Sequence, residues 1–500
     1  LKRLLGWPSL AALTFSGMVG SGWLFASYYA AKMAGPMAIG AWVLCAVAML
    51  LVALCFIELG VSRPVAGGNV RWPAVISGPF VGVMVGWVIF LQIAVGTPSE
   101  ASGLLQYAAR WWPALFAGER LSVIGLVIAA LALVLFTGLN WFGVQLMARV
   151  NNLITVFKVV VPLLTVALLL ASGFHGSNVQ AGGGWAPFGP AAMLTTLTGA
   201  GLVYAFGGIQ TPSMMAGEAR NPRRDIPIGT FVGFGAAFVL YMLLQTSFLG
   251  TVPHDVLAKA GWNGIDFNSP FAQLATLLSL GWLAQLLMID AVVSPGGSLF
   301  MGIGINARNT YGLGQNRTFP SWVARVHPKS GVPRNAMLLN LLVSIVFLFV
   351  FQSWQGLVSA LGMFFAVGYA AIAVAAGANA SDPRLQRVGP TRMISMVAPL
   401  AFVISALIMF WAGWPQVRLA LILFAISIPL FGVLMWRDRE GLPASSLRTG
   451  LWFVVFMLLV GLLSWMGSFK GLGWIPAPID SIVVGVVALV CYFWGLMRSR

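Results

Sequence analysis

The sequence predicts an all-helical protein that crosses a membrane many times. Three observations favour this class: 59% of the 500 residues are hydrophobic, 8% are charged, and the apolar residues gather in long stretches. An ordinary soluble domain carries roughly 25% charged residues, so a water-soluble fold is excluded. A stretch of about 20 apolar residues has the length that a helix needs to cross a ~30 Å hydrocarbon core.

Fourteen segments have the length and hydrophobicity of membrane-spanning helices. In chain order they cover residues 8–30, 36–61, 73–108, 121–140, 150–172, 190–216, 226–250, 270–304, 336–352, 355–379, 393–413, 416–436, 449–467 and 480–497. The segments at 73–108 and 270–304 exceed one crossing, so each is either strongly tilted or continues into a flanking helix.

The basic residues are distributed unevenly among the loops. The formal net charge of +16 would by itself also suit a nucleic-acid-binding protein. With the N-terminus placed in the cytoplasm, 21 of the 28 lysines and arginines fall on the cytoplasmic side, six fall on the opposite side, and Lys158 lies within a span. This is the positive-inside pattern. We therefore expect a multi-pass protein of the plasma membrane, with both termini cytoplasmic and no nucleic-acid partner.

Two spans contain clusters of glycine in mid-membrane. One cluster lies at residues 15–25 (FSGMVGSGWLF) in the first span, and the other at 204–212 (YAFGGIQTP) in the sixth. Interrupted backbone at membrane depth is tolerated only where protein or a wet cavity surrounds it. Glycines also permit close helix packing, but the spacing of five spans favours a pair of functional interruptions.

This spacing predicts two inverted repeats of five spans. Transporters of this kind place an interrupted helix in each repeat, and the interruptions meet at the substrate site near the midplane. The first repeat would cover 1–172 and the second 190–379, with peripheral helices at 393–500. Amides at the start of a half-helix hold a carboxylate, and carbonyls at the end of one hold an ammonium group, so a zwitterionic amino acid suits the site.

The motifs around the interruptions resemble those of the amino acid-polyamine-organocation (APC) superfamily of permeases. Gly20, Ser21 and Gly22 with the apolar residues after them resemble the first-helix signature. Residues 206–210 and 216–227 (AGEARNPRRDIP) resemble the sixth-helix signature and its cytoplasmic exit. The resemblance covers about residues 5–440. It implies a LeuT-type inverted-repeat fold and proton-linked uptake or exchange of amino acids by alternating access.

Within the superfamily, the chain most resembles the aspartate-proton symporters, through residues 20–26, 185–189, 290, 294–297 and 411–414. This resemblance implies an acidic substrate such as aspartate or glutamate and a proton as the coupled ion. Many family members carry glutamate after the sixth-helix glycines, where this chain has Gln210. An amide does not titrate, so a mechanism that protonates that glutamate does not transfer.

We expect main-chain groups at the interruptions to hold the substrate. The carboxylate would meet amides of the first interruption, the ammonium would meet carbonyls of both, and Phe206 would cover the bound molecule. The expected substrate-binding residues are Ser16, Gly17, Gly20, Ser21, Gly22, Phe206, Gly207, Gly208 and Gln210.

Charged residues inside spans are costly and usually functional or paired. The resemblance places Lys158 against the broken first helix, where sodium-coupled relatives of the fold hold sodium, and this favours proton coupling; the alternative is a lysine that snorkels to the surface. Asp290 either carries the coupled proton or pairs with Lys158. Glu100 either carries the proton or has a packing role. At the inner mouth, Glu218 with Arg220 is either a gate latch or ordinary loop charge.

Other classes of protein fit less well. A channel needs continuous rings of polar groups, and an enzyme needs clustered catalytic groups. The histidines fall in loops and the cysteines lack ligand spacing, so we expect no catalysis, cofactor or metal. An exchanger of other amino acids or polyamines, and a non-transporting sensor of the same fold, stay open, as does the oligomeric state.

Overall fold

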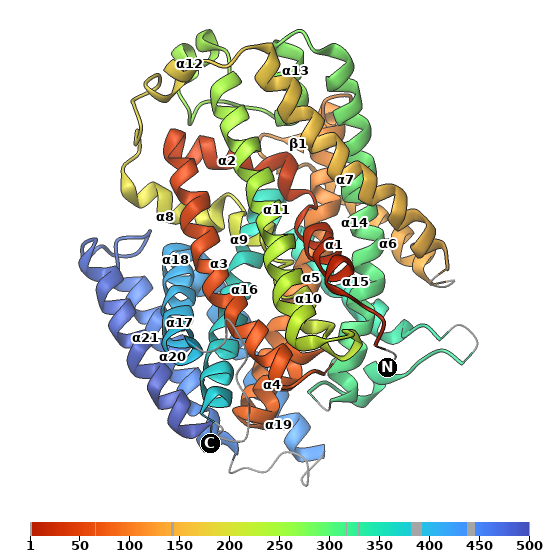
Figure 1. Ribbon diagram of the computed structural model, residues 1–500, viewed down its shortest axis with the longest axis vertical. Coiled ribbons are helices and arrows are strands. Elements are labelled where there is room, and N and C mark those ends of the chain that lie inside the picture. The colour runs from red at the N-terminus through yellow and green to blue at the C-terminus, as the bar shows by residue number, and fades with distance from the viewer. Residues whose placement is uncertain are drawn as a thin grey trace.

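The computed structural model describes residues 3–65, 67–141, 145–316, 318–328, 331–381, 393–437 and 446–499. Its regular structure is almost entirely helical, as predicted, and many of the helices run along the long axis of the molecule (Figure 1). The exception is a short hairpin of β1 (Phe116–Ala117) and β2 (Arg120–Leu121), in which Phe116 pairs with Leu121.

The first part of the chain forms α1 (Trp7–Met18), α2 (Gly22–Ala34), η1 (Gly35–Met37), α3 (Ala38–Ser62), α4 (Gly68–Ile76), α5 (Pro79–Ala108), η2 (Pro113–Leu115), α6 (Val123–Asn140), α7 (Gln145–Ser172) and η3 (Gly176–Val179). The middle part forms α8 (Pro190–Gly199), α9 (Leu202–Ala205), α10 (Thr211–Met214), η4 (Ala216–Glu218), α11 (Pro222–Thr251), α12 (His254–Ala260), α13 (Pro270–Leu277), α14 (Gly281–Gln315), η5 (Ser321–Ala324), α15 (Arg334–Phe351) and α16 (Trp354–Ala380). The last part forms α17 (Ile394–Trp411), α18 (Trp414–Ala425), α19 (Ser427–Arg437), α20 (Ser446–Met466) and α21 (Ile479–Arg498).

Eleven helical segments of the described chain are long and apolar enough to cross a membrane. Three of the fourteen expected spans, at 8–30, 150–172 and 190–216, are not among them. The first and third of these are divided into shorter helices, and the second lies in the continuous helix α7. The total of fourteen spans therefore stays a prediction.

The two overlong segments each contain a sharp bend. The segment 73–108 divides into α4 and α5, because Gly78 adopts a φ of +97° and Pro79 then opens a new helix. Glycine adopts this positive φ without the clash that a Cβ causes. The segment 270–304 divides into α13 and α14, with Ser279 at a φ of +60° between them. Each segment therefore continues into a flanking helix, as one of the two alternatives predicts.

The first and sixth spans are interrupted where the glycine clusters predict it. In the first span α1 ends at Met18 and α2 begins at Gly22. In the sixth, the chain passes from α8 through the single turns α9 and α10, with residues 206–210 outside any helix. The residues of both interruptions are buried or half-buried, so the main-chain groups that leave the helical pattern lie inside the protein.

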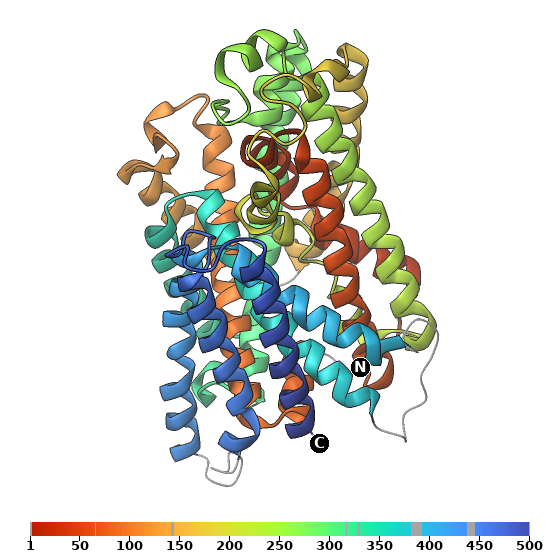
Figure 2. The ribbon, with the colours of Figure 1, turned by 90° about the vertical axis from the view of Figure 1, so that its left-hand side faces the viewer.

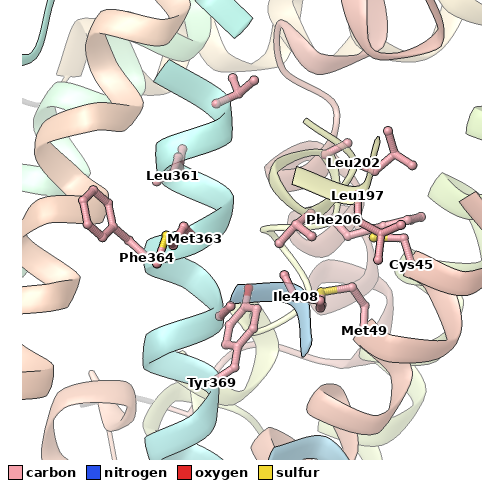
Figure 3. Packing of buried hydrophobic residues seen from close by; sticks show 14 of the residues in the cluster. Cys45, Met49, Leu197, Leu202, Phe206, Leu361, Met363, Phe364, Tyr369 and Ile408 are labelled. Atoms are coloured by element: carbon pink, nitrogen blue, oxygen red, sulfur yellow. The ribbon is translucent and has the colours of Figure 1, made fainter. Parts of the chain in front are cut away.

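The interrupted helices lie within the bundle. Helix α16 packs against α5, α3 and α17, and α11 packs along α1. Figure 3 shows Cys45 and Met49 of α3 facing α16, which contributes Met363 and Tyr369, with Phe206 close to Cys45. The C-terminal helices α17 to α21 gather beside this core (Figure 2). Both chain ends lie toward the same end of the molecule, away from α12 and α13 (Figures 1 and 2).

Candidate functional site

The two interruptions touch through their glycines. A Cβ added to Gly208 would lie 2.7 Å from the carbonyl carbon of Gly17 and 2.8 Å from the amide nitrogen of Met18. Real Cβ atoms do not approach other atoms so closely, so only glycine permits this contact of backbone with backbone. The interruptions therefore meet, as their spacing in the sequence predicts.

Tyr241 of α11 holds both interruptions together. Its hydroxyl lies 2.8 Å from the carbonyl oxygen of Met18, where α1 ends, and 3.2 Å from that of Ala205, where α9 ends. Carbonyls at a helix end lack an intrahelical donor, and buried polar groups need a partner. Nothing in the sequence singles out Tyr241, because a tyrosine in an apolar span carries no signal of its neighbours.

A carboxylate occupies the first interruption. Glu100 of α5 is buried, and its Oε2 and Oε1 accept from the Ser21 amide at 3.2 and 3.4 Å. The Tyr204 hydroxyl donates to Oε1 at 2.6 Å. Ser21 is the residue before α2, so the carboxylate sits at a helix N-terminus, where the helix dipole and free amides favour an anion.

An aromatic wall borders this carboxylate. The indole of Trp354, at the start of α16, donates to the Ser21 hydroxyl at 2.9 Å, and that hydroxyl lies 3.2 Å from the Tyr204 hydroxyl. The Trp354 ring also stacks on Tyr29, with ring centroids 5.6 Å apart. The sequence pattern does not distinguish Tyr204 or Trp354 from the other aromatic residues, although Tyr204 opens the sixth-span glycine motif.

Lys158 contacts the end of α1. Its ammonium donates to the carbonyl oxygen of Ser16 at 3.3 Å, and the side chain is buried. The charges of Glu100 and Asp290 both act on it. Neither carboxylate comes within 4 Å of the ammonium, and the one ion pair in the described ranges joins Lys32 and Glu119 elsewhere. Lys158 thus lies against the broken first helix, where the resemblance places it.

Asp290 lies fully buried on α14. Its Oδ1 accepts from the Ser294 hydroxyl at 2.7 Å, while Oδ2 has no hydrogen-bond partner among the described residues. The indole nitrogen of Trp23 and the hydroxyl of Tyr107 are also buried and lack hydrogen-bond partners in the described chain. The structure therefore gives Asp290 no direct ion pair with Lys158.

Aromatic rings pack around the second interruption. The Phe206 ring is fully buried and packs edge-to-face against both Trp42 and Tyr241, with its centroid 5.5 Å from that of each ring. Its role as a cover over substrate stays a prediction. A Cβ on Gly207 would lie 2.9 Å from the Phe365 ring. The Gln210 side-chain oxygen accepts from the Tyr369 hydroxyl at 3.0 Å, so this amide links the sixth span to α16.

The predicted gate residues contact the N-terminal segment through their main chains. The Leu5 amide donates to the Glu218 carbonyl at 3.0 Å, and the Arg220 amide donates to the Leu5 carbonyl at 2.9 Å. Leu5 and Ala219 thus form a parallel β-bridge. The Arg220 Nε also donates to the Leu4 carbonyl at 3.0 Å. No ion pair joins Glu218 to Arg220 in the described chain.

These features define a polytopic helical membrane protein with a buried central site at two touching helix interruptions. The site offers amides, carbonyls, one cation and two carboxyl groups, which can bind a small charged molecule. No cluster of potential metal ligands occurs among the described residues.

Comparison with known proteins gives the family. A family model described as amino acid permease matches residues 5–493. The chain therefore belongs to the amino acid permease family of the APC superfamily, and the resemblance drawn from the sequence is confirmed.

Two relatives come from Bacillus subtilis (strain 168). The glutamate/serine transporter AimA is 36% identical over 99% of this chain and 94% of its own length. The aspartate-proton symporter is 31% identical over 97% of this chain and 94% of its own length. A third relative, the cationic amino acid transporter 6 of Arabidopsis thaliana, is 25% identical over all of this chain and 86% of its own length. These relatives are transporters, so the expectation of a non-enzymatic protein is confirmed.

Proposed function

We propose that this protein is a secondary active transporter that takes up an acidic amino acid, such as aspartate or glutamate, together with a proton by alternating access. One observation carries the proposal. The Ser21 amide, which has no partner within a helix, donates to the carboxylate of Glu100 at the first interruption. A site that holds one carboxylate at a helix N-terminus is suited to that of an amino acid. The names of the two bacterial relatives support acidic substrates and a coupled proton.

In this proposal the substrate lies across the two interruptions. Its carboxylate takes the amides of Ser21 and Gly22, and that of Gly20 once the 3.0 Å hydrogen bond from the Gly20 amide to the Met18 carbonyl opens. Its ammonium takes the carbonyls near Gly17 and Gly207, because the Ser16 carbonyl already accepts from Lys158 and the Phe206 carbonyl accepts from the Ile209 amide. Gly208 keeps the two interruptions in contact, and Gln210 fixes the second one to α16.

Proton coupling depends on the buried charges. The Lys158 ammonium donates a hydrogen bond to the Ser16 carbonyl near the end of α1. A change in the charge or position of Lys158 therefore weakens this contact with α1, the helix that must move during transport. Glu100 and Asp290, whose charges act on Lys158, are the groups that take up the proton. Gln210 does not titrate, so it has no part in this step.

The inner gate is the contact between the N-terminal segment and the exit of the sixth span. Beside the bridge of Leu5 with Ala219, a separate apolar cluster closes the same region and contains Leu10, Ile57, Ala216, Ala219 and Ile226. Glu218 and Arg220 hold this gate through main-chain hydrogen bonds rather than a latch of opposite charges. Opening toward the cytoplasm then requires α1 and the segment before it to leave residues 218–220.

The arrangement in the membrane belongs to the same proposal. It comprises fourteen spans, inverted repeats at 1–172 and 190–379 of the LeuT type, peripheral helices at 393–500, and both termini on the cytoplasmic side of the plasma membrane. The termini lie toward the same end of the molecule, which supports an even number of spans (Figure 1).

Uptake by proteoliposomes tests the function. We would measure radiolabelled aspartate, glutamate, serine, leucine, arginine and putrescine, with and without an inward proton gradient and without sodium. Accumulation of aspartate or glutamate that requires the gradient is expected. Uptake that needs internal amino acid would identify an exchanger. Gradient-driven uptake of leucine, arginine or putrescine would contradict the acidic specificity. No transport of any compound would favour a sensor.

A further inference from the structure

The Glu100 carboxylate accepts a hydrogen bond from the Ser21 amide, which is the donor proposed for the carboxylate of the substrate. Both of its oxygens lie within 3.4 Å of the Ser21 amide nitrogen, and Oε1 also accepts from Tyr204. The contact joins parts of the chain 79 residues apart, so the tertiary fold builds it. A Cβ on Gly20 would come within 2.7 Å of Oε1, so any other residue there would displace the carboxylate from its present position.

We propose that Glu100 is a built-in substitute for the substrate's carboxylate, which must take up one proton and leave the Ser21 amide before an amino acid can bind there. This inference rests on the proposed function, because it assigns that amide to the substrate. It goes further in stating that the proton site and the substrate site share a hydrogen-bond donor, so that the two bind in exchange.

Electrostatics explains why the exchange requires a proton. Two carboxylates a few ångströms apart in a buried site do not both stay ionised. The groups that face Glu100 are Tyr204 of α9, Lys158 of α7 and Tyr241 of α11, and Lys158 in turn faces Asp290 of α14. Among these, Lys158 is the cation, and its charge is matched in the empty transporter by ionised Glu100.

Charge balance gives the stoichiometry. When the substrate's carboxylate replaces ionised Glu100 at the amide, the negative charge near Lys158 is conserved only if Glu100 becomes neutral. The proton binds to a Glu100 oxygen on the outward-facing side. After the amino acid leaves toward the cytoplasm, Glu100 releases that proton and returns to the amide. One proton therefore enters with each amino acid.

The test is calorimetric titration of the purified full chain with L-aspartate, L-glutamate and L-serine, in two buffers of different ionisation enthalpy. For an amino acid that binds, we expect uptake of about one proton and an affinity that falls about tenfold per pH unit over the range in which Glu100 is ionised. The variant Glu100→Gln, which mimics the neutral side chain, is expected to bind with no proton uptake and with an affinity that does not change with pH. The control variant Glu119→Gln removes an exposed carboxyl and is expected to behave as the native chain does.

Infrared difference spectroscopy of the native chain gives a readout that does not depend on the folding of a variant. Addition of the amino acid is expected to produce the stretching band of a protonated carboxyl group, and Glu100→Gln should lack this band. Binding by the native chain without proton uptake, or without this band, would overturn the inference. Full proton uptake by Glu100→Gln would overturn it as well. Each of these results would leave the proposed transport function unaffected. If none of the three amino acids binds, both proposals are overturned.

Discussion

Lys158 shows how much can depend on one side chain within the membrane. A buried ammonium is unfavourable unless polar groups surround it, and here the Ser16 carbonyl and the charges of Glu100 and Asp290 do so. Because Ser16 lies two residues before the end of α1, the Lys158 ammonium links that end of the helix to α7.

Replacement of Lys158 by methionine should reduce proton-driven accumulation at least tenfold, while the protein still folds. Methionine fills a similar volume and carries no charge, so the bond to Ser16 and the positive charge near Glu100 and Asp290 are both lost. The two buried carboxyl groups then remain protonated, because no cation offsets their negative charge. Accumulation in proteoliposomes and thermal unfolding measure the two effects. The exposed Lys259→Met serves as control, and undiminished accumulation by Lys158→Met would contradict its coupling role.

At the scale of elements, the site exists because short helices end where others begin. Helices α1 and α2, and α9 and α10, leave amides and carbonyls without intrahelical partners. The close approach of Gly17 and Gly208 brings these groups together, and the long helix α11 fixes the arrangement through Tyr241. The spacing between the two interruptions is therefore set by backbone contact.

Gly208→Ala should separate the interruptions and reduce transport more than tenfold. The added methyl group would lie less than 3 Å from Gly17 and Met18, and backbone atoms cannot give way as the end of a flexible side chain can. Gly235→Ala on α11 is the matched control, because a Cβ there meets nothing within 4 Å. The control should retain transport, and its free energy of unfolding should rise by up to about 1 kcal/mol because alanine has the higher helix propensity. Equal transport by both variants would show that the close contact is dispensable.

A disulfide across the inner gate should arrest transport reversibly. Neighbouring strands lie about 4.8 Å apart, a separation that suits the Cα atoms of a disulfide, so Leu5→Cys with Ala219→Cys should cross-link on oxidation. The native cysteines Cys45, Cys55 and Cys491 are buried and should not interfere. Uptake should fall more than tenfold and recover with reductant, whereas the single-cysteine variants should show no change. Unimpaired uptake by the cross-linked chain would place the inner gate elsewhere.

The whole molecule combines an apolar exterior with an uneven distribution of charge. Exposed leucines, valines and isoleucines on α6, α15 and α21 suit contact with lipid. The chain ends lie toward one end of the bundle (Figure 2), and the basic loops predict that this end faces the cytoplasm.

Reporter fusions test this orientation. Alkaline phosphatase, which is active only outside the cytoplasmic membrane, should be inactive when fused after Arg498 and active when fused after Gln352, in the connection between α15 and α16. Green fluorescent protein at the same two positions should give the reverse pattern. The opposite result at Arg498 would mean an odd number of spans or an inverted chain.

The sequence by itself determined the membrane class, the family and the interruptions of the first and sixth spans. These features depend on hydrophobicity and on glycine, and both are local properties that the order of residues records. It also singled out Glu100, Lys158 and Asp290, because any charge within an apolar stretch is conspicuous.

Only the tertiary structure decided what these residues touch. The seat of Glu100 on the Ser21 amide, the bridge of Tyr241 between the interruptions and the pairing of Leu5 with Ala219 join residues far apart in the chain. The sequence leaves open whether Glu218 with Arg220 is a gate latch or ordinary loop charge. The contact there is made by main-chain groups, which every residue carries and no sequence pattern distinguishes. Such contacts depend on how helices pack, and packing is a property of the whole fold.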